Sequence, residues 1–167
     1  MHNELTRKDI ALMKKELDER RIVLRPKLLE AVKVARAFGD LSENFEYKAA
    51  KQEKNRNESR IRYLENMIRT AHIVDERPKG DGVALYDKVT VFLPEDNETE
   101  EFQIVTTMRK DPLHGLISLE SPVGKALMGK KLGDVVHIQV DETYGYDMVI
   151  RAIEKGQNDG DIPLNTY

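Results

Sequence analysis

The feature that most constrains the fold is helical periodicity across the first 75 residues, interrupted once by a short segment that contains glycine. Apolar or small residues recur at steps of three and four on both sides of the interruption, which places them on one face of each helix. The first stripe consists of Ile10, Met13, Leu17, Leu24, Leu28, Ala31, Ala35 and Phe38. The second consists of Tyr47, Ala50, Ile61, Leu64, Ile68 and Ala71.

Residues 39–44 form the interruption, and so short a turn predicts that the two helices are antiparallel neighbours. Gly39 is a natural helix terminator, and Ser42 could cap the second helix. Neither stripe is wide enough for a globular bundle, so we expect a two-helix antiparallel coiled coil. Pro26 lies inside the first helix and predicts a kink or local break there.

The second half of the chain changes to the alternation that is typical of strands. We expect strands at residues 88–93, 101–107, 115–119, 135–140 and 147–153. A short helix is predicted from Pro122 to Met128, with Ser121 as its cap and Gly129 as its end. The fold class is therefore α+β, with the helical hairpin followed by a small antiparallel sheet that packs on one helix.

These patterns predict an organisation in four parts. They are a coiled-coil domain at 1–75 with its tip at 39–44, a linker at 76–82, a sheet domain at 83–156 and a mobile tail at 157–167. The first 74 residues hold 17 Lys and Arg against 12 Asp and Glu, and the remainder holds 10 against 18, which gives the net charge of −3. A basic half followed by an acidic half suggests two modules with different partners.

The composition excludes several classes of protein. There is no cysteine, which excludes disulfide scaffolds, zinc ribbons, iron–sulfur sites and cysteine nucleophiles and fits a reducing, cytoplasmic compartment. No run of about 18 uncharged apolar residues is present, so we expect no membrane partner. The four histidines are scattered, and no phosphate-binding glycine loop or serine-hydrolase motif occurs. Nothing in the sequence indicates a self-contained active site.

Two acidic residues at the turn, Asp40 and Glu43, are the candidates for chemistry. Placed at the end of a projecting hairpin, they could present oxygens to a hard cation such as Mg²⁺. Two carboxylates are too few for a tight site, so other ligands would have to come from elsewhere. The alternative is that these acids only complement the dipole of the second helix and cap it.

Basic residues follow the turn on the second helix and face it on the first. They are Lys48, Lys51, Lys54, Arg56, Arg60 and Arg62, with Lys33 and Arg36 on the first helix. The surface could follow the phosphates of a nucleic acid, or it could be an ordinary solvated helix face with Glu–Lys pairs. Lys54 and Asn57 fall on the apolar seam, where polar residues cost stability.

Two motifs in two domains carry a resemblance to a known family. Residues 39–50, Gly-Asp-Leu-Ser-Glu-Asn-Phe-Glu-Tyr-Lys-Ala-Ala, resemble the coiled-coil tip of the bacterial Gre transcript-cleavage (transcription elongation) factors. Residues 118–130, Ser-Leu-Glu-Ser-Pro-Val-Gly-Lys-Ala-Leu-Met-Gly-Lys, resemble a motif of the C-terminal domain of the same family. Both motifs occur in the order of the family, and the resemblance covers residues 5–155.

The resemblance implies an FKBP-like C-terminal domain that sits at the rim of the secondary channel of bacterial RNA polymerase. The coiled coil would enter that channel, where Asp40 and Glu43 would help hold the second catalytic Mg²⁺ and a water. The polymerase would then cleave backtracked RNA, so the protein is expected to stimulate an enzyme without being one. We expect no tightly bound cofactor in the protein alone, and a monomer.

The resemblance also implies roles for other residues. Asn44 and Tyr47 would support the tip, and Glu120, Ser121 and Pro122 would contact the polymerase at the rim. The nascent RNA 3′ segment would meet a basic surface made of Arg36, Lys48, Lys51 and Lys54.

Two other interpretations remain open at this point. The first is a Gre-like regulator that blocks the channel without causing cleavage, against which the two-acid tip argues. The second is a prolyl isomerase or chaperone with a helical arm, although the C-terminal half lacks the dense aromatic pocket that such catalysis would need.

Overall fold

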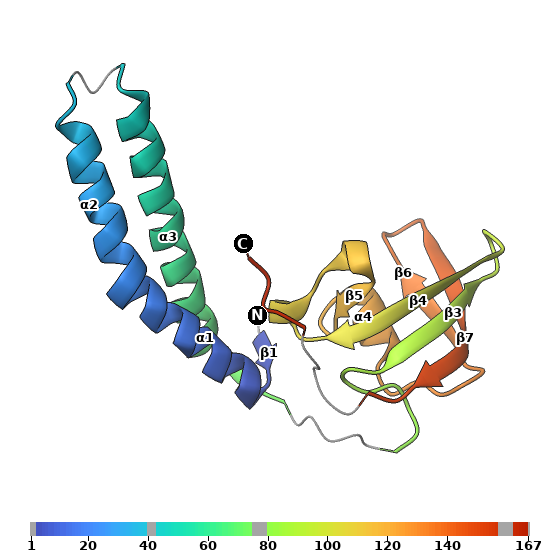
Figure 1. The fold of residues 1–167 in the computed structure, drawn as a ribbon. Helices are drawn as coiled ribbons and strands as arrows, with labels where there is room; N and C mark the ends of the chain where they lie inside the picture. Colours follow the sequence, from blue (N-terminus) through green and yellow to red (C-terminus); the bar gives the residue numbers. More distant parts are fainter. Residues whose placement is uncertain (1–2, 40–42, 75–79, 157–161, 167) are drawn as a thin grey trace. The chain divides into compact units, whose positions relative to one another are not determined.

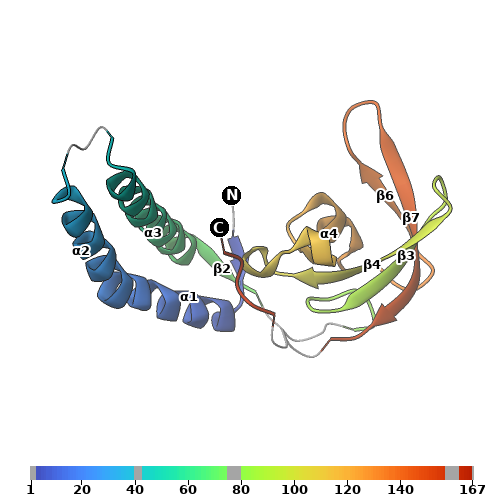
Figure 2. The same ribbon diagram turned by 45° about the horizontal axis from the view of Figure 1, so that its top comes forward.

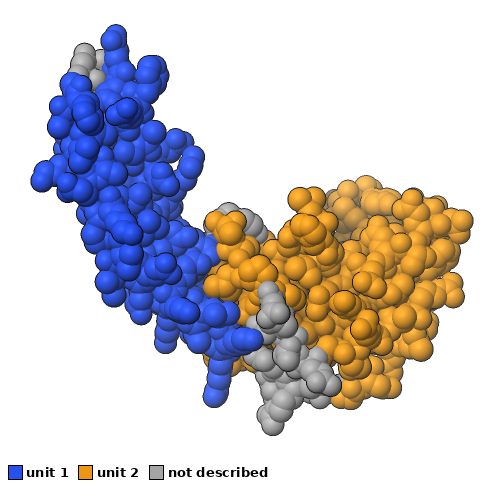
Figure 3. Space-filling model, viewed as in Figure 1, with its two compact units in different colours: residues 1–3, 7–71, 167 blue, residues 4–6, 72–166 orange. Residues whose placement is uncertain are grey.

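The computed structural model describes residues 3–39, 43–74, 80–156 and 162–166, and it divides into two compact units (Figure 3). Unit 1 contains residues 1–3, 7–71 and 167, and unit 2 contains residues 4–6 and 72–166. Unit 1 is a helical hairpin and unit 2 is built on a mostly antiparallel sheet. The predicted fold class is confirmed. In the described part of the chain, no helix is both long and apolar enough to cross a membrane.

The first arm of the hairpin is a continuous run of three helical segments that lies alongside a single long helix (Figure 1). In chain order the elements are α1 (Arg7–Glu19), the π-helical turn η1 (Arg20–Leu24), α2 (Arg25–Arg36) and α3 (Phe45–Arg69). The two arms are antiparallel, because the short segment between α2 and α3 returns the chain along the same apolar seam.

The break expected at Pro26 takes the form of the π-helical turn η1. Pro26 sits in the first turn of α2, where its ring would clash with the carbonyl of Ile22 in a regular α-helix. The wider π turn also changes the hydrogen bonding, since the Arg25 N–H donates to the Arg20 carbonyl five residues earlier. Proline therefore changes the winding of the arm without ending it.

Beyond the π turn, one position of the predicted apolar stripe differs. Met13, Leu17 and Ala35 are buried as predicted and Leu24 and Leu28 are half-buried, but Val32 is buried in place of Ala31, which is exposed. The prediction for Ala31 is wrong because the stripe steps by four from Leu28 to Val32 and then by three to Ala35, whereas the sequence prediction took these two steps in the opposite order. Phe38 is also exposed, since it lies beyond the end of α2.

Unit 2 contains a five-stranded sheet of order β5-β4-β3-β7-β6 that curls around the short helix α4 (Figure 2). Its strands are β3 (Lys88–Leu93), β4 (Glu98–Val105), β5 (Leu116–Ser118), β6 (Val135–Gln139) and β7 (Gly145–Glu154). Alternate side chains of the strands point into one core, which Leu127 of α4 completes. The predicted strands are present with small shifts of their ends.

Two features of the strands differ from expectation or were not predicted. Strand β5 pairs parallel to β4, because the chain between them crosses over through two 3₁₀ turns, η2 (Thr107–Arg109) and η3 (Pro112–His114). In addition, the short strands β1 (Asn3–Leu5) and β2 (Ala71–Ile73) form a separate two-stranded sheet.

Helix α4 (Pro122–Leu127) begins as the sequence predicts. The Ser121 hydroxyl accepts a hydrogen bond from the Gly124 N–H at 3.0 Å, and Pro122 occupies the first turn. A Cβ at position 124 would lie 2.0 Å from the Ser118 carbonyl oxygen, so only glycine allows α4 to pack this closely on the preceding strand.

The tail predicted at residues 157–167 is described only from 162 to 166. The Asn165 N–H donates to the Met108 carbonyl at 2.7 Å, and the Asn165 side-chain amide donates to the Thr107 carbonyl at 3.0 Å. Ile162 packs against the core of the sheet domain. This part of a segment expected to be mobile is therefore hydrogen-bonded to η2.

Candidate functional site at the hairpin tip

The turn between α2 and α3 carries the candidate acidic residues. Asp40 and Ser42 lie outside the described residues, as does Leu41, whereas Gly39 and Glu43 are described and both exposed. Gly39 has φ +128°, a backbone conformation that residues with a Cβ rarely adopt. Glycine is therefore required for the chain to leave α2 at this point.

Asn44 holds the two arms together next to the tip. Its Oδ1 accepts a hydrogen bond from the Tyr47 N–H at 2.9 Å and so caps α3, and its Nδ2 donates to the Ala35 carbonyl at 2.7 Å. The sequence suggested Ser42 as the cap, but in the structure α3 begins at Phe45 and Asn44 is its cap. The Asn44 side chain thus forms hydrogen bonds with a backbone N–H in the first turn of α3 and with a backbone carbonyl in the last turn of α2.

Replacing Asn44 by alanine is expected to lower the free energy of unfolding of the hairpin by about 1–2 kcal/mol, because a cap and a second hydrogen bond are lost together. Urea unfolding followed by circular dichroism would measure the change. Asn55→Ala is the matched control, since Asn55 is exposed on α3 and should change stability by no more than about 0.5 kcal/mol. Equal effects of the two substitutions would contradict this role of Asn44.

The Glu43 side chain is exposed, and none of the other described residues forms a hydrogen bond or ion pair with it. Among the described residues there is no group of three or more acidic or histidine side chains that could hold a metal ion. Carboxylate oxygens are suitable ligands for Mg²⁺, but two such residues need further ligands from another molecule. The tip can contribute to a metal site without forming one by itself.

Basic side chains surround two aromatic rings just below the tip. The Arg36 guanidinium carbon lies 5.5 Å from the ring centre of Tyr47, and Lys51 Nζ lies 6.0 Å from the same centre. Lys48 Nζ lies 5.7 Å from the ring centre of Phe45. A hydrogen bond from Arg36 and the charge of Lys51 lower the pKa of Tyr47. Cations and aromatic rings together make a surface that favours anionic partners.

Three of the four basic residues predicted to face RNA are exposed, namely Arg36, Lys48 and Lys51. Lys54 is half-buried, in agreement with its predicted place at the seam. Asn57, the other polar residue predicted at the seam, is fully buried. The structure therefore groups the predicted tip-supporting and basic residues at one end of the hairpin.

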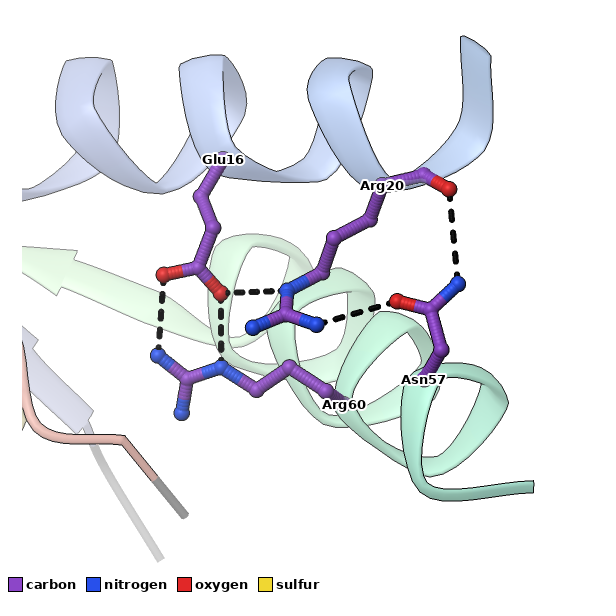
Figure 4. A network of polar contacts seen from close by, with 4 residues as sticks. All are labelled: Glu16, Arg20, Asn57 and Arg60. Carbon is purple, nitrogen blue, oxygen red and sulfur yellow. Dashed lines mark hydrogen bonds and ion pairs between the residues drawn. The ribbon is translucent and has the colours of Figure 1, made fainter. Parts of the chain in front are cut away.

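Arg60 does not belong to that basic surface. Its side chain is only 5% exposed and makes a bidentate contact with Glu16, with Nε–Oε2 at 2.7 Å and Nη2–Oε1 at 3.1 Å (Figure 4). Sequence spacing included Arg60 among the residues available to a nucleic acid, and this is wrong, because its side chain is buried against Glu16 within the hairpin. Glu16 lies on the opposite arm of the hairpin, 44 positions earlier, so local spacing does not indicate this pairing.

Glu16 and Arg60 are part of a larger polar network within the seam. Arg20 Nε donates to Glu16 Oε2 at 2.9 Å, and Arg20 Nη1 donates to Asn57 Oδ1 at 2.9 Å. The Asn57 amide donates in turn to the Arg20 carbonyl at 3.4 Å (Figure 4). These contacts join η1 to α3, so the polar seam residues specify which turns of the two arms face each other.

The hairpin is expected to lose stability in acid. Burial alone would raise the pKa of Glu16, but hydrogen bonds and charges from Arg60 and Arg20 outweigh it and place this pKa below the ordinary 4.5. A pKa that is lower in the folded state contributes stability above the unfolded value, and this is lost as the pH falls through the folded value. Urea unfolding of wild type and Glu16→Gln from pH 7 to below pH 4.5 tests this expectation. Parallel pH profiles would contradict it.

Two of the three residues predicted to contact the polymerase are engaged within unit 2. Glu120 Oε2 accepts a hydrogen bond from the Thr107 hydroxyl at 2.6 Å, and its Oε1 accepts one from the Glu4 N–H at 3.3 Å. The Ser121 hydroxyl caps α4 and donates to the Ser118 carbonyl at 2.7 Å. Pro122 is exposed beside them. The loop from 118 to 122 therefore has a defined shape and presents an exposed proline.

Comparison with known proteins gives consistent matches over both halves. The family model "Transcription elongation factor, N-terminal" (GreA_GreB_N) matches residues 3–73, and "Transcription elongation factor, GreA/GreB, C-term" matches residues 77–155. Transcription elongation factor GreA from Lactococcus lactis subsp. lactis (strain IL1403) is 44% identical over 135 residues, which cover 80% of this chain and 86% of the relative.

Two further comparisons extend over more of the chain. The GreA protein of Geobacillus kaustophilus (strain HTA426) is 41% identical over 150 residues, which cover 89% of this chain and 93% of the relative. The crystal structure of GreA factor homolog 1 (Gfh1) of Thermus thermophilus aligns with 93% of this chain and 100% of its own at 29% identity, with a TM-score of only 0.40. The sequence matches alone carry the assignment: this chain belongs to the GreA/GreB family of transcription elongation factors.

Proposed function

We propose that this protein binds bacterial RNA polymerase, enters the secondary channel with its helical hairpin and stimulates the polymerase's own cleavage of backtracked RNA. The observation that carries the proposal is the exposed Glu43 at the end of the hairpin, two positions before the start of α3, where Asn44 and Tyr47 hold the turn. Helix α3 has 25 residues and so extends about 38 Å at 1.5 Å per residue. A narrow arm of this length can carry an acidic group into a deep site.

Asp40 and Glu43 would hold Mg²⁺ together with ligands from the polymerase. The described part of the tip fits a metal site shared with the polymerase. The Glu43 carboxylate is exposed, and too few acidic residues lie near it among the described residues to bind the metal without further ligands. When bound, the metal would stabilise the attacking and leaving oxygens of the phosphoryl displacement. The role of this chain is to place its carboxylates and orient a water, so the protein alone is not expected to cleave RNA.

The basic surface below the tip would contact phosphates of the extruded RNA 3′ segment. Arg36 is exposed on the first arm and Lys48 and Lys51 are exposed on the second, where Lys54 extends the same face of α3. Each phosphate that a cation neutralises releases counterions, so binding of this RNA should weaken with salt. Asn44 and Tyr47 would keep the tip in register with these cations.

The sheet domain would dock at the rim of the channel through residues 120–122. Pro122 supplies an exposed apolar contact, while Glu120 and Ser121 fix the backbone that presents it. We propose that the protein acts as a monomer in the cytoplasm, since one hairpin occupies one channel. No prolyl isomerase activity is expected, because the domain serves for docking.

Transcript cleavage in stalled elongation complexes tests the proposal. Adding the protein to backtracked complexes with Mg²⁺ should shorten the RNA from its 3′ end and restore elongation. The protein without polymerase should leave the same RNA intact. Slower synthesis with no shortened RNA would contradict the proposal and indicate a regulator that blocks the channel.

A further inference from the structure

All three residues of η2 form hydrogen bonds with the segment from Ile162 to Asn165. The carbonyls of Thr107 and Met108 accept from the side chain and the backbone N–H of Asn165, at 3.0 and 2.7 Å. The Arg109 guanidinium donates to the Ile162 carbonyl. We call residues 162–166 the C-terminal strap. It binds η2 with its backbone and one amide side chain, and Ile162 packs against the core of the sheet domain.

A one-turn 3₁₀ segment depends strongly on such outside contacts. Within η2 the Arg109 N–H donates to the Thr106 carbonyl at 2.9 Å, and a single turn of this kind has little stability of its own. Arg109 is only 2% exposed, so its charge needs hydrogen-bond acceptors inside the protein. The strap supplies one acceptor to this guanidinium and two donors to the turn.

The same turn is also hydrogen-bonded to the loop that precedes α4. The Thr107 hydroxyl donates its single proton to Glu120 Oε2 at 2.6 Å, so the Ser118 hydroxyl must donate to Thr107 Oγ1 at 2.9 Å. The Ser118 oxygen then accepts from the Glu120 N–H at 3.1 Å. The backbone of Thr107 is held by the strap while its side chain holds this loop.

We propose that the C-terminal strap positions the loop from 118 to 122 for binding to RNA polymerase, with Asn165 as the positioning residue. This inference rests on the proposed function of that loop as a docking contact. The strap lies beyond residue 155, where the match to the family model ends. It therefore lies outside the matched residues and acts on the docking loop through Thr107.

Asn165→Ala removes the side-chain bond to Thr107 and keeps the backbone bond to Met108. We expect it to raise the protein concentration needed for half-maximal RNA cleavage about fivefold, with the rate at saturation unchanged. Deleting residues 162–167 should raise that concentration about tenfold or more. Thr166→Ala is the matched control and should have no effect, since Thr166 is exposed at the end of the strap.

A positioning role predicts two results that a loss of folding would not give. A synthetic peptide of residues 157–167, added to the deletion variant, should restore the affinity for polymerase, and the same peptide with Asn165→Ala should restore less. In NMR spectra of the full chain, Asn165→Ala should shift the amide signals of Thr107 and Glu120. If the deletion variant proves poorly folded, Asn165→Ala decides the question.

Two outcomes would overturn the inference while leaving the proposed function intact. Unchanged affinity in both variants would show that the strap does not position the loop, and higher affinity would show that it covers the docking surface. If wild-type protein neither binds polymerase nor promotes cleavage, the proposed function fails instead. The NMR comparison would then still establish whether Asn165 controls the conformation of the loop.

Discussion

Replacing Glu43 by alanine should reduce stimulated RNA cleavage by at least about a hundredfold and leave the affinity for RNA polymerase within about twofold of wild type. The reason is that the Glu43 carboxylate is exposed and has no partner among the described residues. Its removal should leave the free energy of unfolding unchanged. The substitution should only remove a ligand of the metal and an acceptor for the water in the cleavage step. The measurement is the rate of RNA shortening in stalled complexes at saturating protein.

Glu46→Ala is the matched control for this prediction, because Glu46 is an exposed acid in the first turn of α3. It should retain nearly full cleavage, which would separate a specific role of the tip carboxylate from a general effect of negative charge. Asp40→Ala is expected to behave like Glu43→Ala. Full cleavage by both Asp40→Ala and Glu43→Ala would sink the proposal that the tip acts at the metal.

Replacing Glu16 by alanine should lower the free energy of unfolding of the hairpin by about 2 kcal/mol, the second large effect that we expect. The substitution leaves the buried Arg60 guanidinium without its carboxylate, and an uncompensated buried charge is strongly destabilising. The expected loss is smaller than for a fully buried ion pair, because the Glu16 side chain is 26% exposed and water can solvate Arg60 in part after the substitution. Urea unfolding measures it.

Glu58→Ala is the control for Glu16→Ala, since it also removes a glutamate that pairs with arginine across the hairpin. Its partner Arg25 has a side chain that is 36% exposed, so the loss should be no more than about 1 kcal/mol. The double substitution Glu16→Ala with Arg60→Met should recover part of the stability, because an apolar side chain can fill the site of the charge. Equal losses at Glu16 and Glu58 would contradict the structural importance of the buried pair.

The sequence alone determined the parts of the molecule that depend on local patterns. The period of three and four defined the two arms, and Gly39 located the end of the first. Alternation located the strands of the sheet domain, and Ser121 with Pro122 marked the start of α4. The acidic tip and its basic surroundings also followed from short motifs, because these residues lie within a few positions of one another.

Only the tertiary structure decided how residues far apart in the chain are paired. At the seam of α2 the buried residue is Val32 and not the predicted Ala31, since steps of three and four both fit a helix and only the facing arm decides their order. Arg60, one of the basic residues that the sequence made available to a nucleic acid, is a buried partner of Glu16. Asn165 lies 58 positions from Thr107, to which it binds. Such contacts form because packing removes polar groups from water, and each buried group then needs a hydrogen-bond partner. The partner can come from any part of the chain, so a local sequence pattern does not predict it.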